Sequence, residues 1–179
     1  MTITYLGLSL WRPWAAVVAS GDKLIENRKS PPPSRLLRQG TRVLIHAAQR
    51  WDGYATVHHA ALRAWLTDAG ANEEPHPTGI VGVCRVIGAL HLPRPGDPAS
   101  ARSASRLAVR AREVWCEHRD RWATGPWCWI LDEMLRLPRA VPCRGMQALG
   151  WTPPPDVLDQ VRAQLVEEPD DLRVREVPR

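Results

Sequence analysis

Three charged side chains near the start of the chain, Lys23, Glu26 and Arg28, have the residue types and spacing of a polar site. They follow a glycine, in a segment over 24–28 whose alternating pattern predicts a β-strand. Side chains two residues apart lie on the same face of a strand, so Glu26 and Arg28 should be neighbours. The alternative is a surface ion pair on an edge strand, which would contribute little to stability.

If these residues line a cleft, two cations and one carboxylate give it a net positive charge. That charge suits a phosphate or a developing oxyanion. Glu26 paired to Arg28 would keep a low pKa and orient the guanidinium, whereas desolvated it could act as a general base. Lys23 stands at the start of the strand and could reach the cleft as a phosphate contact or proton donor. Lys23 and Glu26 are therefore the candidate catalytic residues, and Lys23 and Arg28 the candidate anion ligands.

Two tryptophans precede this strand. Trp11 and Trp14 flank Arg12 and a proline, and the chain as a whole has nine tryptophans, two tyrosines and no phenylalanine. Many of these rings must be core, but tryptophans beside charged residues can stack on bases. We therefore include Trp11, Arg12 and Trp14 among the candidate nucleic-acid contacts.

Two later residues complete the set of candidates. His46 lies near the end of the strand expected over 41–48, as an acid–base partner or, more commonly for single histidines, as a core residue hydrogen-bonded to the backbone. Arg144 precedes a glycine at a turn and is a candidate phosphate contact.

The elements that must position these residues follow from periodicity and turn residues. A short helix is expected between Pro13 and Gly21, because proline suits the first helical turn and glycine the position after a helix end. Strands are predicted over 5–10, 24–28, 41–48, 79–92 and 127–131. Helices are predicted over 51–69 and 106–121, with a C-terminal helix after the prolines at 153–155. Glycines at 82 and 88 predict a bulge or bend in the fourth strand.

Five or six short strands, mostly without crossover helices between them, favour an α+β fold. They indicate a small, partly closed β-barrel with flanking helices rather than a doubly wound sheet. We expect one domain over 1–165 with an inserted mobile loop at about 93–105, rich in Pro, Ser, Gly and Ala. Residues 166–179 alternate charges without a core pattern and are expected to form a loosely ordered tail.

The composition indicates which class of partner the chain binds. The formal net charge is +5, and arginine carries nearly all of the positive charge. This positive charge favours an anionic partner. A GC-rich genome would account for most of the arginine excess. No apolar run is long enough to span a membrane and no secretory signal is visible, so we expect a cytoplasmic protein. The four cysteines form no CxxC pair and are expected to be buried thiols, with no metal and no cofactor.

Six blocks of the sequence occur in the order typical of one family: LSLWRPWAAVVASGDKLIENR, RVLIHAA, GIVGVCRV, GPWCWIL, LPRAVPCRG and ALGW. Over roughly 5–151 the chain resembles the ASCH (activating signal cointegrator homology) domain of the PUA-like superfamily. The resemblance implies a β-barrel with helices around a cleft. The family pattern G-x-K-x-x-E-x-R falls on Gly21, Lys23, Glu26 and Arg28 and implies binding of RNA or nucleotides there, and some members act on RNA or modified nucleosides.

One departure from the family narrows the chemistry. Small bacterial relatives that deacetylate acetylcytidine have a threonine three residues after the lysine, where this chain has Glu26, so their hydroxyl nucleophile is absent. We therefore expect first a domain that binds RNA, single-stranded nucleic acid or a nucleotide through a positively charged cleft with tryptophan stacking. The alternatives are an RNA-processing enzyme, either a ribonuclease or a modified-nucleoside hydrolase, using the same cleft, and a protein-interaction module.

Overall fold

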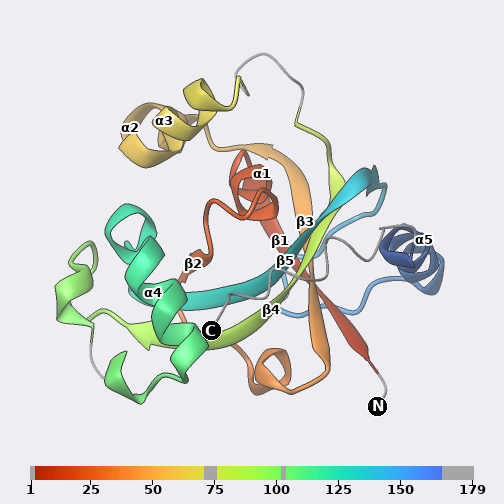
Figure 1. The fold of residues 1–179 in the computed structure, drawn as a ribbon. Helices are drawn as coiled ribbons and strands as arrows, with labels where there is room; N and C mark the ends of the chain where they lie inside the picture. Colours follow the sequence, from red (N-terminus) through yellow and green to blue (C-terminus); the bar gives the residue numbers. More distant parts are fainter. Residues whose placement is uncertain (1–2, 71–75, 102–103, 167–179) are drawn as a thin grey trace.

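The computed structural model describes residues 3–70, 76–101 and 104–166 (Figure 1). The strands are β1 (Thr4–Arg12), β2 (Ile25–Arg28), β3 (Thr41–Trp51), β4 (Gly79–His91) and β5 (Trp127–Val141). The α-helices are α1 (Trp14–Ala19), α2 (Gly53–His58), α3 (Ala60–Asp68), α4 (Val109–Trp122) and α5 (Pro155–Val166). The charged tail is predicted over 166–179, and its residues 167–179 lie outside the described part of the chain.

The five strands form one mixed sheet in the order β1-β3-β4-β5-β2. β1 and β3 are parallel, and the other three neighbouring pairs are antiparallel. The α+β prediction is confirmed. Figure 1 shows the long strands β4 and β5 curving across the centre of the molecule, with the helices arranged around them.

The predicted small β-barrel is wrong, because the sheet stays open. Closure needs a hydrogen-bonded ladder between the first and last strands of the sheet, and none joins β1 to β2 among the residues described here. β2 has only four residues, and the prolines at 31–33 that follow it cannot extend a ladder. A side chain spans the gap instead: Nη2 of Arg28 donates to the carbonyl of Ser9, 3.1 Å away.

Several local predictions are confirmed. Gly21, after α1, has a φ of +86°, as a glycine past a helix end requires. The ladder between β4 and β5 shifts register at Ile80/Gly82 and at Val86/Gly88, where the two glycines predicted a bend. The segment 93–105, expected as an inserted mobile loop, contains the 3₁₀ helix Pro98–Ser100, where the Asp97 side chain accepts from the backbone N–H of Ala99, and its mobility stays a prediction.

The helix predicted over 51–69 is two helices, α2 and α3. His59 interrupts them with an extended backbone (φ −94°, ψ 100°), and its Nδ1 accepts from the N–H of Leu62, 3.2 Å away. His59 therefore caps the second helix. The fifth strand is also longer than predicted. Pro138 lies within β5 beyond the residues 127–130 that pair with β2, and no described strand pairs with β5 on that side at Pro138. An edge position tolerates proline because its missing N–H breaks no ladder bond.

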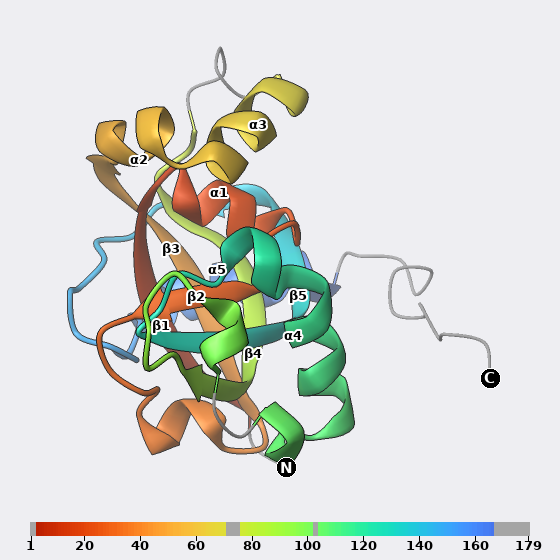
Figure 2. The ribbon, with the colours of Figure 1, turned by 90° about the vertical axis from the view of Figure 1, so that its left-hand side faces the viewer.

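The core has layers on both sides of the sheet. α1 is buried nearly all round, with Ala15, Val17 and Val18 fully inaccessible. Trp115 of α4 and Val161 of α5 pack against other parts of the sheet, each in its own hydrophobic cluster. Figure 2 shows α2 and α3 beyond α1 at one end of the molecule, and α4 beside β4 and β5.

The cysteine prediction holds for two residues. Cys84 and Cys128 are buried, Cys143 is half-buried and Cys116 is exposed, and all four are free thiols. Burial raises the pKa of Cys128 to about 11. Among the described residues no helix is long and apolar enough to cross a membrane, and none of their His, Cys, Asp and Glu side chains form a group of three that could hold a metal ion.

The edge strand β1 carries a tightly packed glycine that tests the fold. A Cβ on Gly7 would lie 2.2 Å from a ring atom of Trp151, whose carbonyl also accepts from the Gly7 N–H. We expect Gly7→Ala to lower the free energy of unfolding by about 1–3 kcal/mol in urea denaturation, as overpacked cores do. Gly53→Ala is the control, since its Cβ meets nothing closer than 3.8 Å. Equal stability of the two variants would contradict this packing.

Candidate functional site

A cleft of about 270 Å³ opens between the two edge strands, where the sheet does not close. Its lining comes from β1, α1, β2, the start of α3 and the segment before β5. The lining residues are Ser9, Leu10, Trp11, Trp14, Lys23, Glu26, Asn27, Arg28, His59 and Thr124. The structure thus brings together five of the predicted site residues: Trp11, Trp14, Lys23, Glu26 and Arg28.

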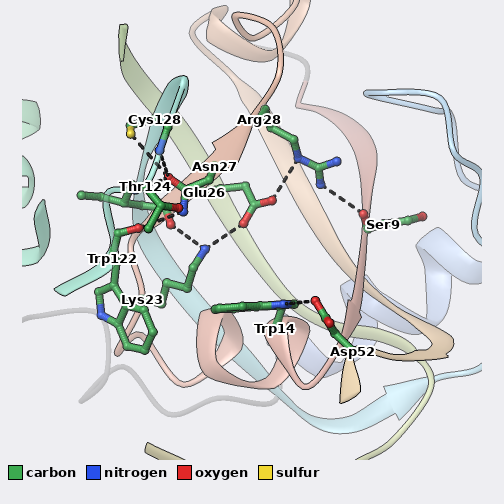
Figure 3. Close-up of polar contacts among 12 residues, drawn as sticks. Ser9, Trp14, Lys23, Glu26, Asn27, Arg28, Asp52, Trp122, Thr124 and Cys128 are labelled. Carbon is green, nitrogen blue, oxygen red and sulfur yellow. Dashed lines mark hydrogen bonds and ion pairs between the residues drawn. The ribbon is translucent and has the colours of Figure 1, made fainter. Parts of the chain in front are cut away.

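Three of these residues, Lys23 just before β2 and Glu26 and Arg28 within it, form a chain of charges (Figure 3). Nζ of Lys23 donates to Oε2 of Glu26 at 2.9 Å and to the carbonyl of Ile25 at 2.6 Å. Nε of Arg28 lies 3.0 Å from Oε1 of Glu26. Glu26 and Arg28 are therefore neighbours on one strand face, as the alternation predicted. Both carboxylate oxygens of Glu26 face a cation.

The surroundings of Glu26 keep it ionised. Burial alone would raise the pKa of this carboxyl, but the charges of Lys23 and Arg28, with the hydrogen bond from Lys23, outweigh burial. The net result is a pKa below the ordinary value of Glu. A carboxylate of low pKa is a weak proton acceptor, so this geometry suits positioning of Arg28 better than general-base chemistry.

The ammonium of Lys23 makes its contacts inside the protein. Its side chain is 2% exposed, and its ammonium lies 5.4 Å from the centroid of the Trp14 ring. The predicted reach of Lys23 toward a ligand is therefore replaced by hydrogen bonds to Glu26 and the backbone.

Arg28 is the cation that faces the opening. Its side chain is 24% exposed, and its guanidinium lies 5.8 Å from the centroid of the Trp129 ring. Nη2 is engaged by Ser9, but the hydrogen bonds among the described residues leave Nη1 without an acceptor. Because Lys23 neutralises Glu26, the unbalanced charge of the cleft belongs to Arg28.

Tryptophans form the opposite wall. Nε1 of Trp14 donates to Oδ2 of Asp52 at 2.9 Å, and the ring meets His59 edge-to-face with centroids 5.0 Å apart. Trp11 is 43% exposed, with the guanidinium of Arg50 stacked 3.7 Å from its ring centroid. Trp14 is thus held in place, while Trp11 stands at the mouth of the cleft.

Sequence reasoning missed His59 and Asn27. Nδ2 of Asn27 donates to the carbonyl of Trp122, and Oδ1 accepts from the N–H groups of Thr124 and Gly125, which ties β2 to the segment before β5. The alternation pattern placed Asn27 on the other strand face, so its amide carried no signal for a site. His59 contacts a tryptophan 45 positions earlier, and no local pattern could connect the two.

Burial, and then the charge of Lys23, lower the pKa of His59 below its ordinary value. His59 is therefore neutral at physiological pH. Since its Nδ1 accepts a hydrogen bond, the ring proton of the neutral form is on Nε2.

Three predicted site residues lie outside this cleft. The guanidinium of Arg12 donates to the carbonyls of His76 and Gln49 and lines a separate cavity on the far side of α1. Nε2 of His46 lies 3.1 Å from the carbonyl of Cys143, an arrangement like the core alternative considered for it, and burial lowers its pKa. Arg144 lies beside His46 in another depression.

The buried pair can be tested by a mutant cycle. Lys23→Met leaves Glu26 with Arg28 as its only ion-pair partner among the described residues, so it should lower the free energy of unfolding by about 3 kcal/mol in urea at pH 7. The double variant Lys23→Met/Glu26→Gln should lose less, because the uncompensated carboxylate is gone. Lys29→Met, the same change at an exposed lysine, is the control and should stay within about 0.5 kcal/mol of wild type. A double variant less stable than Lys23→Met would contradict this account.

The lowered pKa of Glu26 has a consequence for acid stability. Its folded pKa lies below the ordinary 4.5, so the unfolded chain takes up this proton first as the pH falls. The stability that ionised Glu26 provides is complete above that value and is lost as the pH drops through the folded pKa. The unfolding free energy of wild type minus that of Glu26→Gln should therefore shrink below roughly pH 4.5. A difference that stays constant or grows in acid would show that Glu26 is not held as an anion.

No protein-family model matches the chain, and no curated protein matches it in sequence. Solved structures similar to it include two mutant proteins of ASCH from Zymomonas mobilis, with TM-scores of 0.43 and 0.46 and identities of 14% and 13%. These likenesses cover 89% of this chain and 95% and 97% of theirs. ASCH from the same organism has a TM-score of 0.45 at 13% identity, over 89% of this chain and 94% of its own. All three of these solved structures are ASCH proteins.

Proposed function

We propose that this chain binds single-stranded RNA or a nucleotide in the cleft between β1 and β2, with Arg28 as the phosphate ligand and Trp11 as the stacking surface. The observation that carries the proposal is the pairing, across one opening, of a partly exposed guanidinium with an exposed indole. This arrangement meets the two chemical needs of a nucleotide, an anion and a flat aromatic base.

The phosphate end of the site rests on Arg28. Glu26 holds the guanidinium at 3.0 Å and Ser9 holds Nη2 at 3.1 Å, so the group is oriented before a ligand arrives. Lys23 offsets the charge of Glu26, which leaves a net positive charge at the opening. An oriented guanidinium binds phosphate with less loss of side-chain entropy than a free one.

The base end rests on Trp11. Arg50 covers part of the indole, and 43% of the side chain remains accessible. The cleft volume of about 270 Å³ is just under the range of roughly 300–1,000 Å³ typical of small-molecule pockets. It therefore suits one nucleotide unit. Unpaired bases can be splayed into such a cleft, whereas a duplex keeps them stacked.

The same geometry favours binding over catalysis. Glu26 has a lowered pKa and both oxygens paired, and Lys23 donates its protons to Glu26 and the backbone. Neither group is free to move a proton at a substrate. The cleft agrees with the RNA or nucleotide binding that the ASCH resemblance implies.

The test is RNA binding by fluorescence anisotropy with a labelled twelve-nucleotide single-stranded RNA at several salt concentrations. Arg28→Ala should weaken binding about tenfold or more, the effect of losing a charged hydrogen bond, and should flatten the salt dependence. Trp11→Ala should cost at least about fivefold, as loss of one stacked base does.

The matched control is Arg162→Ala, which removes the same charge from α5, where Arg162 pairs with Asp159. It should change the affinity little. An equal loss in Arg28→Ala and Arg162→Ala would mean that only overall charge matters. Undetectable binding of both this RNA and the ribonucleoside monophosphates at low salt would refute the proposal.

A further inference from the structure

We infer that the cleft is the first position of a longer track, and that the neighbouring nucleotides of the same single strand lie on a surface beside it. This rim surface is formed by Trp11, Arg50, Tyr54 and Val57. The inference rests on the proposed function and extends it by assigning the class of ligand, an oligonucleotide in preference to a free nucleotide.

The distribution of exposed aromatic rings carries the inference. The tryptophan and tyrosine side chains that the described residues expose are Trp11, Trp51 and Tyr54, and Trp11 and Tyr54 belong to the rim surface. Their exposed fractions are 43%, 42% and 75%. The other tryptophans and Tyr5 are buried or half-buried. Exposed apolar rings cost hydration free energy, so their presence beside a cleft indicates a contact surface.

The rim surface is joined to the cleft through Trp11 and Trp14. Trp11 belongs to both, whereas Trp51 lies opposite Arg12 in the ladder between β1 and β3, with its ring centroid 5.4 Å from that of His76, beside the separate cavity. The short helix α2 is anchored at each end on Trp14: Asp52 before it accepts from Nε1, and His59 after it meets the ring. The exposed side chains of α2 are thereby held at the edge of the cleft.

Charge favours a nucleic acid over an apolar partner here. Arg50 is exposed and stacks on Trp11, and Arg63, also exposed, donates to the carbonyl of Val57 at 2.8 Å. The carboxylate within this segment, Asp52, is occupied by Trp14 and by the N–H of Ala55. Cations interleaved with accessible rings are what proteins use to follow a single strand.

The decisive measurement compares two probes on the intact chain: the four ribonucleoside 5′-monophosphates, and the twelve-nucleotide single-stranded RNA of mixed sequence. The RNA should bind at least about tenfold more tightly than any monophosphate, since added stacked bases each contribute. Tyr54→Ala should weaken RNA binding at least about fivefold and leave monophosphate binding unchanged.

Val109→Ala is the matched control, because Val109 is 71% exposed at the start of α4, away from the rim surface. It should change neither affinity. Monophosphate binding that depends on Arg28, with no gain for the longer RNA, would overturn the track and leave the proposed function standing. Loss of both ligands would remove both proposals. A Tyr54→Ala variant with normal RNA affinity but an altered oligomeric state, measured by sedimentation, would instead assign the rim surface to a second copy of the chain.

Discussion

The cleft depends on a gap that the backbone leaves open. β1 and β2 are the two edges of the sheet, and the link between them is made by a side chain, from Arg28 to the carbonyl of Ser9. In a closed barrel, ladder hydrogen bonds would occupy this seam. Here the seam holds the chain of charges and two tryptophans, so the feature that prevents closure of the barrel also creates the space for a ligand.

Holding the seam open requires buried charge. Lys23 is almost inaccessible and Glu26 nearly so, and desolvation of such a pair offsets much of the attraction between its members. The pair is therefore a weak source of stability. Its effect is positional: Lys23 balances Glu26, Glu26 orients Arg28, and the one unbalanced charge is presented at the opening. A hydrophobic pair of the same volume would pack as well but would not hold the Arg28 guanidinium in its orientation.

Trp14 connects this polar chain to the rest of the molecule. Its ring lies near the Lys23 ammonium, its Nε1 binds Asp52, and its edge meets His59. The break between α2 and α3 falls at His59 because its ring caps α3 while packing on Trp14. The cleft and the helix beside it thus share one anchoring residue, which holds α2 next to the opening.

The sequence by itself determined the features that depend on neighbours along the chain. The approximate positions of the strands, the bend at Gly82 and Gly88, the left-handed Gly21 and the shared face of Glu26 and Arg28 all follow from periodicity and local backbone preference. Those preferences act over a few residues, so they fix element type and facing direction. They carry no information about which distant elements meet.

Tertiary structure decided everything that depends on such meetings. It left the sheet open, because closure would require β1 and β2, the strands at the two opposite edges of the sheet, to pair with each other. It brought His59 to Trp14, and it gave Arg12 and His46 backbone carbonyls from distant segments as partners. From the sequence pattern one can conclude only that a buried polar side chain needs hydrogen-bond partners. Which groups satisfy it, and whether a ligand can be one of them, is settled by packing over the whole chain.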